Sequence, residues 1–181
     1  MKTLLRQLLD LCLLRIGPQD LPYSPALTRG LVVTSAALSL LFLQAFGRGE
    51  RNVSHLVLSM VLLLVLPWLL LRLRQREARY AQTLAAFAGS SALFMVFLLP
   101  IEISLYGMPL PDRETPMTPQ QLTITLLSFM LLGWRLSIEG NIWRHALDLP
   151  KFAGLPLALA CFTFELALSQ LLMPVAESAT P

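Results

Sequence analysis

Hydrophobic residues in this chain are gathered into five long runs, which short polar segments separate. A helix that crosses a lipid bilayer needs about 20 mostly apolar residues at a rise of about 1.5 Å each, and the runs approach that length. The pattern therefore predicts an all-α, polytopic transmembrane helix bundle over residues 26–173. We expect its spans at residues 26–46, 54–71, 83–106, 122–138 and 152–173.

The segment before the first run, residues 1–25, has a different pattern. Over residues 3–16 most leucines and Cys12 fall on one side of a helical wheel, opposite the polar residues. This predicts an amphipathic helix, and two placements are open: it lies in the cytoplasmic membrane interface, or it packs on the protein's own bundle or on a partner. We expect Gly17 and Pro18 to end the helix, because Gly accepts a left-handed cap and Pro cannot continue the hydrogen-bond ladder.

Polar residues also mark where two spans begin. Ser24 followed by Pro25 suits the cap and first position of the first span. Thr118 and Gln121 have the spacing of a capping box ahead of the fourth span. After the fifth span, we expect residues 174–181 to be a disordered tail.

The composition agrees with a lipid environment. Hydrophobic residues make up 55% of the 181 positions and charged residues 14%, with a mean hydropathy of +0.64, which leaves little sequence for a soluble domain. The net charge of +3 is small and dispersed, which argues against a nucleic-acid partner. Two cysteines, Cys12 and Cys161, are too few and too far apart for a disulfide framework or a CxxC metal site.

Basic residues predict an orientation, since short loops rich in Lys and Arg stay cytoplasmic. On the five-span scheme, 11 of the 14 basic residues fall on the side of the N-terminus or at its membrane boundary. We therefore expect a cytoplasmic N-terminus and an outward C-terminus. Because 12 of the 14 are Arg, a GC-rich bacterial genome is indicated, and with it the inner membrane.

Ionisable side chains inside the spans are the first candidates for function, because each costs roughly 2.5 to 3.5 kcal/mol on insertion scales. Glu165 lies within the fifth span, Glu102 near the outer end of the third, and His55 at the start of the second. If these helices are neighbours, the three side chains can form a proton relay, a cation site or a polar network. The alternative is structural: Glu165 is protonated, or bonded to Ser169, Gln170 or another helix.

The fourth span carries a further charged pair. Arg135 and Glu139 are four residues apart and so share one helix face, where they can pair. Trp134 and Trp143 suit the aromatic belt at a membrane interface. Residues 134–151 thus predict either a cytoplasmic contact surface or a simple helix exit.

Enzymatic chemistry has no support in the sequence. HExxH, GxSxG and paired intramembrane aspartates are missing, so the ligands and nucleophiles of those hydrolases are not present. His55 and His145 fall on opposite sides of the membrane, which argues against a two-His metal site. We expect no enzyme, no cofactor and no metal.

Two short segments match each other: Asp20-Leu21-Pro22 before the first span and Asp148-Leu149-Pro150 before the fifth. An Asp two residues ahead of Pro favours an Asx-type turn, which predicts a similar chain path into both spans.

The first of these segments, together with five spans and an outward C-terminus, resembles the Yip family of membrane proteins. That family introduces its first span with a DL-x-GP-like motif, matched here by Asp20, Leu21 and Pro25, with Tyr23-Ser24 where Gly is usual. The resemblance implies a non-enzymatic membrane protein that works through partners in the bilayer, in trafficking or membrane organisation.

Two functions follow from these observations. The first is a small integral membrane scaffold or accessory protein that holds a membrane-protein partner or a second copy of itself in the lipid bilayer. The alternative is a transporter or channel component that uses Glu165 and Glu102.

Overall fold

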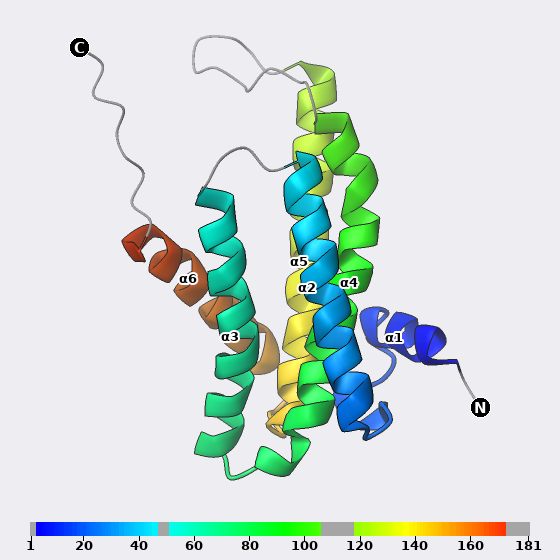
Figure 1. Cartoon of the computed structure of the whole chain (residues 1–181), viewed down its shortest axis with the longest axis vertical. Coiled ribbons are helices and arrows are strands. Elements are labelled where there is room, and N and C mark those ends of the chain that lie inside the picture. The colour runs from blue at the N-terminus through cyan, green and yellow to red at the C-terminus, as the bar shows by residue number, and fades with distance from the viewer. Residues whose placement is uncertain (1–2, 47–50, 106–117, 173–181) are drawn as a thin grey trace.

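The computed structural model of the chain describes residues 3–46, 51–105 and 118–172, and these residues form helices joined by turns. A short helix, α1 (Leu4–Cys12), precedes five long ones (Figure 1). The long helices are α2 (Pro25–Phe46), α3 (Arg51–Leu73), α4 (Tyr80–Leu105), α5 (Pro119–Ala146) and α6 (Gly154–Leu172). Single 3-10 turns, η1 (Pro18–Asp20) and η2 (Glu77–Arg79), precede α2 and α4. The predicted all-α class is confirmed.

All five long helices have the length and apolar composition needed to cross a bilayer, and the mean hydropathy of their 18-residue apolar stretches is 1.3 to 2.5. Four of them begin and end within about three residues of the predicted spans. Large apolar side chains on their outer faces, such as Val33, Phe129 and Met130, are exposed. That pattern is compatible with a protein surrounded by lipid. The predicted tail, residues 174–181, lies outside the described residues.

The fourth long helix is longer than predicted. The sequence indicated a span at residues 122–138, whereas α5 has 28 residues and ends at Ala146. The polar stretch after Ile138 stays helical because Ile142, Trp143 and Ala146 are buried in the hydrophobic core. Consequently α5 runs beside α4 along the length of the bundle (Figure 1).

Helix α4 is the centre of the bundle and contacts α2, α3 and α5. Eight consecutive residues, 83–90, are buried, so this part of α4 is covered on all sides. Most of them are small, which lets neighbouring helices approach closely. The Thr28 hydroxyl of α2 donates a hydrogen bond of 3.0 Å to the Ala81 carbonyl of α4.

Helices α3 and α6 form a separate layer. Figure 1 shows α3 standing to one side of α2, α4 and α5, with α6 running obliquely behind it. Glycines hold α6 against α5: a methyl group on Gly154 would lie 2.2 Å from the Gly140 carbonyl oxygen. The two helix backbones therefore touch where α6 begins, and α6 diverges from there.

The N-terminal helix packs on the protein's own bundle, which was one of the two placements open from the sequence. Leu8, Leu11 and Cys12 are buried, and Leu8 lies directly over Gly89 of α4. The Trp134 indole of α5 donates a hydrogen bond of 3.0 Å to the Cys12 carbonyl. A membrane-interface position for the opposite side of α1 stays a prediction.

The expected end of this helix was wrong. Helix α1 ends at Cys12 and not at Gly17, because Leu14 adopts a left-handed conformation with φ of 59°. The amide of Arg15 then donates to the Asp10 carbonyl, and that of Leu14 to the Leu11 carbonyl. These two bonds make a Schellman cap, which usually has glycine at the left-handed position.

Both predicted helix starts are confirmed. The Ser24 hydroxyl accepts a hydrogen bond from the Leu27 amide at 3.3 Å, and Pro25 is the first residue of α2. Thr118 and Gln121 bond reciprocally, so the capping box of α5 is present.

The matching segments around Asp20 and Asp148 do not have similar geometry. The Asp20 carboxylate accepts the Gly17 amide at 2.8 Å and caps η1. Asp148 is left-handed with φ of 49° and pairs with Arg76 and Arg79. The prediction of a shared path into two spans is wrong, because one Asp closes a turn and the other ends α5.

Candidate functional site

A cavity of about 240 Å³ lies between the two layers of the bundle. We call it the bundle cavity, and all five long helices contribute to its wall. Its polar and charged side chains are Ser35, Ser39, Ser59, Ser91, Arg135, Glu139 and Glu165. Aromatic and other apolar side chains form the rest of the lining, among them Phe87, Phe94, Met95, Trp143, Cys161 and Phe162.

Arg135 and Glu139 form the ion pair that their spacing predicted. The Arg135 Nε donates to Glu139 Oε1 at 2.9 Å, and both side chains lie on the cavity wall. Arg135 also lies over the Phe94 ring, with Cζ 5.9 Å from the ring centroid. Arg135 is eleven residues from the end of α5, roughly 16 Å along the helix, and so lies well inside this 28-residue helix.

Glu165 enters the same cavity from α6. Its Oε1 accepts a hydrogen bond from the Ser59 hydroxyl of α3. Of the structural partners considered from the sequence, the one observed is therefore another helix. Ser169 donates instead to the Leu166 carbonyl at 3.0 Å. A neutral hydroxyl leaves the charge of an ionised Glu165 uncompensated.

Serine hydroxyls complete the polar wall. Ser39 donates to the Ser35 carbonyl at 2.8 Å and lies 3.5 Å from the Met95 sulfur. Ser35 itself is fully buried, and its Oγ has no hydrogen-bond partner within the described part of the chain. A buried hydroxyl without a hydrogen-bond partner lowers the stability of the fold by roughly 1 to 3 kcal/mol. A ligand or a water molecule in the cavity that bonds to Ser35 would remove this cost.

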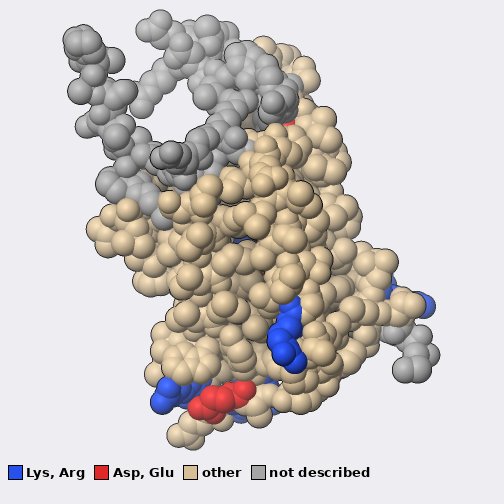
Figure 2. Space-filling view, in the orientation of Figure 1, with Lys and Arg blue, Asp and Glu red and all other residues tan. Residues whose placement is uncertain are grey.

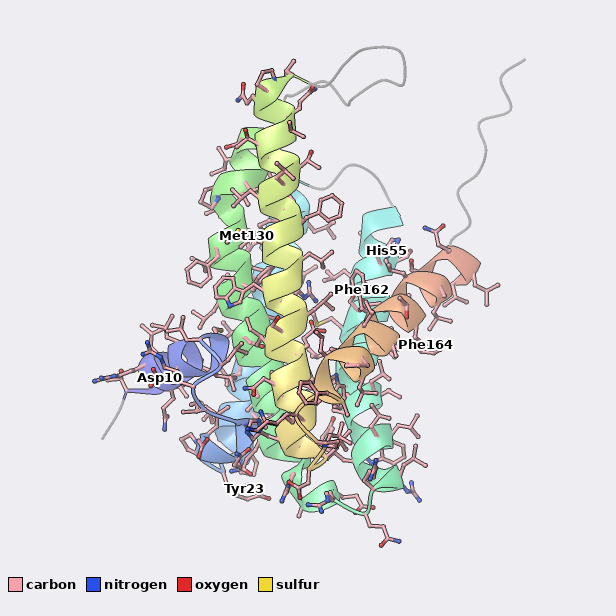
Figure 3. All side chains as sticks on the ribbon, turned by 180° about the vertical axis from the view of Figure 1, so that it is seen from behind. Asp10, Tyr23, His55, Met130, Phe162 and Phe164 are labelled. Carbon is pink, nitrogen blue, oxygen red and sulfur yellow. The ribbon has the colours of Figure 1, made fainter. Side chains whose placement is uncertain are left out.

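The structure does not bring the three expected side chains together in this cavity. Glu165 lines it, whereas Glu102, in the last turn of α4, and His55, near the start of α3, do not. Figure 3 shows His55 at the end of α3 that lies beside the C-terminal half of α6. On α6, Phe162 lines the cavity and Phe164 is exposed. The partner of Glu165 is thus Ser59, and the α5 ion pair lies on the wall of the same cavity.

No group of three or more His, Cys, Asp and Glu side chains suited to a metal ion occurs in residues 3–46, 51–105 and 118–172. The carboxylates of the cavity are two, from different helices, and one of them is already paired with Arg135. The cavity accordingly has a charged wall, without a group of metal ligands among these residues.

The polar stretch at residues 134–151 is largely used inside the protein. Trp143 is 3% exposed and packs on Phe87 with ring centroids 4.8 Å apart, so the expectation of an interfacial Trp belt is wrong for this residue. Asn141 donates to the Ile16 carbonyl at 3.0 Å, which ties the N-terminal segment to α5. Two residues of this stretch, Trp134 and Asn141, therefore hold the N-terminal segment of the chain.

Its last part forms a charged cluster at one end of the bundle. Figure 2 shows few charged side chains over the middle of the visible face and a group of them at its lower end. There Arg79 contacts the Asp148 carboxylate at 2.9 Å and donates to the His145 carbonyl at 2.9 Å. The hydrogen bond from Arg79, reinforced by Arg76, holds the pKa of Asp148 below its usual value.

Comparison with known proteins gives no relative from which a function of this cavity could be inferred. No family model, curated protein or solved structure matches the chain significantly. The resemblance to the Yip family through Asp20, Leu21 and Pro25 stays a prediction. Sequence reasoning missed Ser59 and Ser35, because serines in a hydrophobic run have no distinguishing signal until the neighbouring helix is known.

Proposed function

We propose that the protein is a component of a transporter or channel that receives a small solute in the bundle cavity. This is the second of the two functions expected from the sequence. The observation that supports it is the cavity itself, whose wall is contributed by all five long helices and includes two carboxylates and an Arg from α5 and α6.

A purely structural role explains this arrangement less well. Polar side chains that only fasten helices pack against one another, because hydrogen-bonded contacts between helices need no free volume. Here Arg135, Glu139 and Glu165 border open space, and Ser35 has no partner in the described residues. Charged groups at such depth are costly, and in membrane proteins they mark solute and ion pathways.

The proposal includes a setting. We place the protein in a bacterial inner membrane with its N-terminus in the cytoplasm and its C-terminus outside. The charged cluster supports this orientation, because Arg72, Arg74, Arg76 and Arg79 follow or end α3 on the same end of the bundle as the α5–α6 turn.

A scaffold or accessory role is the second candidate. Leu5 is 58% exposed and Leu13 52% exposed, on a segment that projects from the bundle beside α4 (Figure 1). Such leucines suit a membrane-protein partner, a second copy of the chain or the lipid surface. Purification in mild detergent tests this role, since a stoichiometric partner lost in a Leu5→Gln, Leu13→Gln variant would support it.

Access of water to the cavity tests the transport proposal. Native Cys161 lines the cavity, and methanethiosulfonate reagents modify only thiols that meet water as thiolates. Cys12 lies in α1 and does not line the cavity, and Cys12→Ser leaves Cys161 as the one cysteine of the sequence. In this variant we expect Cys161 to react in intact membranes with a charged, membrane-impermeant reagent applied to one side.

Leu159→Cys, made in a Cys12→Ser, Cys161→Ser background, is the matched control. Leu159 is 49% exposed on the same helix but does not line the cavity, so its thiol would face lipid and stay unmodified. If neither Cys161 nor the control thiol is modified when the reagent is applied to either side of the membrane, a solute pathway through this cavity is refuted.

A further inference from the structure

The net charge of the bundle cavity indicates its solute. We infer that the cavity binds an organic monocation, an inference that rests on the proposed function. With all three charged side chains ionised, the wall carries one positive and two negative charges. Arg135 is already paired with Glu139, whereas the hydrogen bond that Glu165 accepts within the described part of the chain comes from the neutral Ser59 hydroxyl. A ligand with a single positive charge neutralises the site.

The volume and lining favour an organic cation over a metal ion. A cavity of about 150 Å³ holds a benzene molecule, and this one, at about 240 Å³, has room for a substituted ring. Phe87 and Phe162 line the cavity with aromatic rings of the kind that attract an ammonium group, whereas Arg135 already lies over Phe94. Ca²⁺ and Mg²⁺ take six or more oxygen ligands, which a largely apolar wall of this kind does not provide.

Two further polar groups suit a positive ligand. The Ser35 hydroxyl is buried without a partner in the described residues, and it can accept a hydrogen bond from an ammonium N–H. Pro67 has no N–H, so the Leu63 carbonyl lacks its usual helical donor, and both residues line the cavity. The Ser35 hydroxyl, on a residue that lines the cavity, adds to the pull of the Glu165 carboxylate on a cation.

A pair of ligands that differ only in charge tests the inference. Phenyltrimethylammonium is a fixed monocation, and tert-butylbenzene is its neutral isostere. Equilibrium dialysis of the purified full chain in mild detergent, with detergent-only controls for partitioning, gives both dissociation constants. We expect the cation to bind roughly tenfold or more tightly than the isostere, because an uncompensated carboxylate lies within a few ångströms of it.

Three variants distinguish the effect of the Glu165 charge on binding from an effect of altered structure. Glu165→Gln keeps the shape and removes the charge, so cation binding should weaken roughly tenfold while isostere binding is unchanged. Ser59→Ala removes the hydrogen bond and keeps the charge, so cation binding should persist. Glu102→Gln removes a carboxylate outside the cavity and should change neither constant.

Equal binding of cation and isostere would overturn the monocation inference, as would loss of binding in Ser59→Ala and Glu165→Gln alike. If Cys161 is accessible and neither ligand binds, the inference fails and the transport proposal stands. If Cys161 is inert and neither ligand binds, both fail. Melting curves for each variant identify any that does not fold. If Glu165→Gln does not fold, the comparison of cation and isostere on the wild-type protein decides the inference.

Discussion

Replacing Gly154 by Ala tests the packing that positions α6 and hence Glu165. The added methyl group would lie 2.2 Å from the Gly140 carbonyl oxygen and 2.9 Å from the Arg144 Cβ. Ordinary contact begins near 3.4 Å, so the two backbones must separate by roughly 1 Å. Neither neighbour is the flexible end of a side chain. Overpacking of this kind costs about 1 to 3 kcal/mol.

The glycines of α5 supply graded controls. A methyl group on Gly140 would meet the Leu155 backbone at 3.0 Å, so Gly140→Ala should destabilise less than Gly154→Ala. Gly133 has open space around it, and Gly133→Ala should stabilise α5 by up to about 1 kcal/mol through helix propensity. Thermal unfolding in one detergent, followed by circular dichroism, measures all three variants.

The order of the melting temperatures tests the backbone contact between α5 and α6. We expect Gly154→Ala lowest, then Gly140→Ala, then the wild type, with Gly133→Ala highest and steps of a few degrees. A Gly154→Ala variant as stable as the wild type would refute the backbone contact between α5 and α6. Gly133→Ala destabilised to the same degree would show that the method does not resolve local packing.

Three other predictions follow from the contacts described above. Trp134→Phe keeps an aromatic ring but removes the donor to the Cys12 carbonyl, so stability should fall by about 1 kcal/mol and limited proteolysis should cut the N-terminal segment faster; an unchanged cleavage rate would contradict this. Because the pKa of Asp148 is lower in the folded protein, its contribution to stability is present above the unfolded pKa and lost as pH falls through the folded one. Melting temperatures should therefore drop more below about pH 4 in the wild type than in Asp148→Asn, and parallel curves would argue against the ion pair. Glu139→Gln leaves Arg135 without its carboxylate and should destabilise by roughly 2 to 3 kcal/mol, whereas the double variant with Arg135→Gln should recover part of the loss; additive losses would show that the two residues do not interact.

Hydropathy predicted the five long helices because a bilayer demands a nearly fixed number of apolar residues. Local chemistry predicted their starts, since the bonds of Ser24 and of the Thr118 capping box involve neighbours in the chain. The end of α5 was missed because its final turns are polar and are stabilised by tertiary contacts of Ile142 and Trp143. The early end of α1 was missed because Leu14 carries no signal for a left-handed conformation.

The candidate site was predictable only where it depends on neighbours along the chain, and not where it depends on contacts between helices. The Arg135–Glu139 pair follows from helical spacing and could be foreseen. The meeting of Glu165 with Ser59 depends on which helices are neighbours, and hydropathy does not determine that. The close approach at Gly140 and Gly154 sets the path of α6, and through it the position of Glu165.

The docking of the N-terminal segment has a consequence for synthesis at the ribosome. Its two hydrogen bonds to α5, from Trp134 and Asn141, join residues separated by more than 120 positions in the chain. The first segment to emerge meets α4 before these two bonds can form, because α4 is translated before α5 and Leu8 lies over Gly89. Before α4 is made, Leu8, Leu11 and Cys12 have neither helix to cover them. A nascent chain halted before residue 80 should therefore expose a leucine-rich N-terminus to chaperones or to the lipid surface.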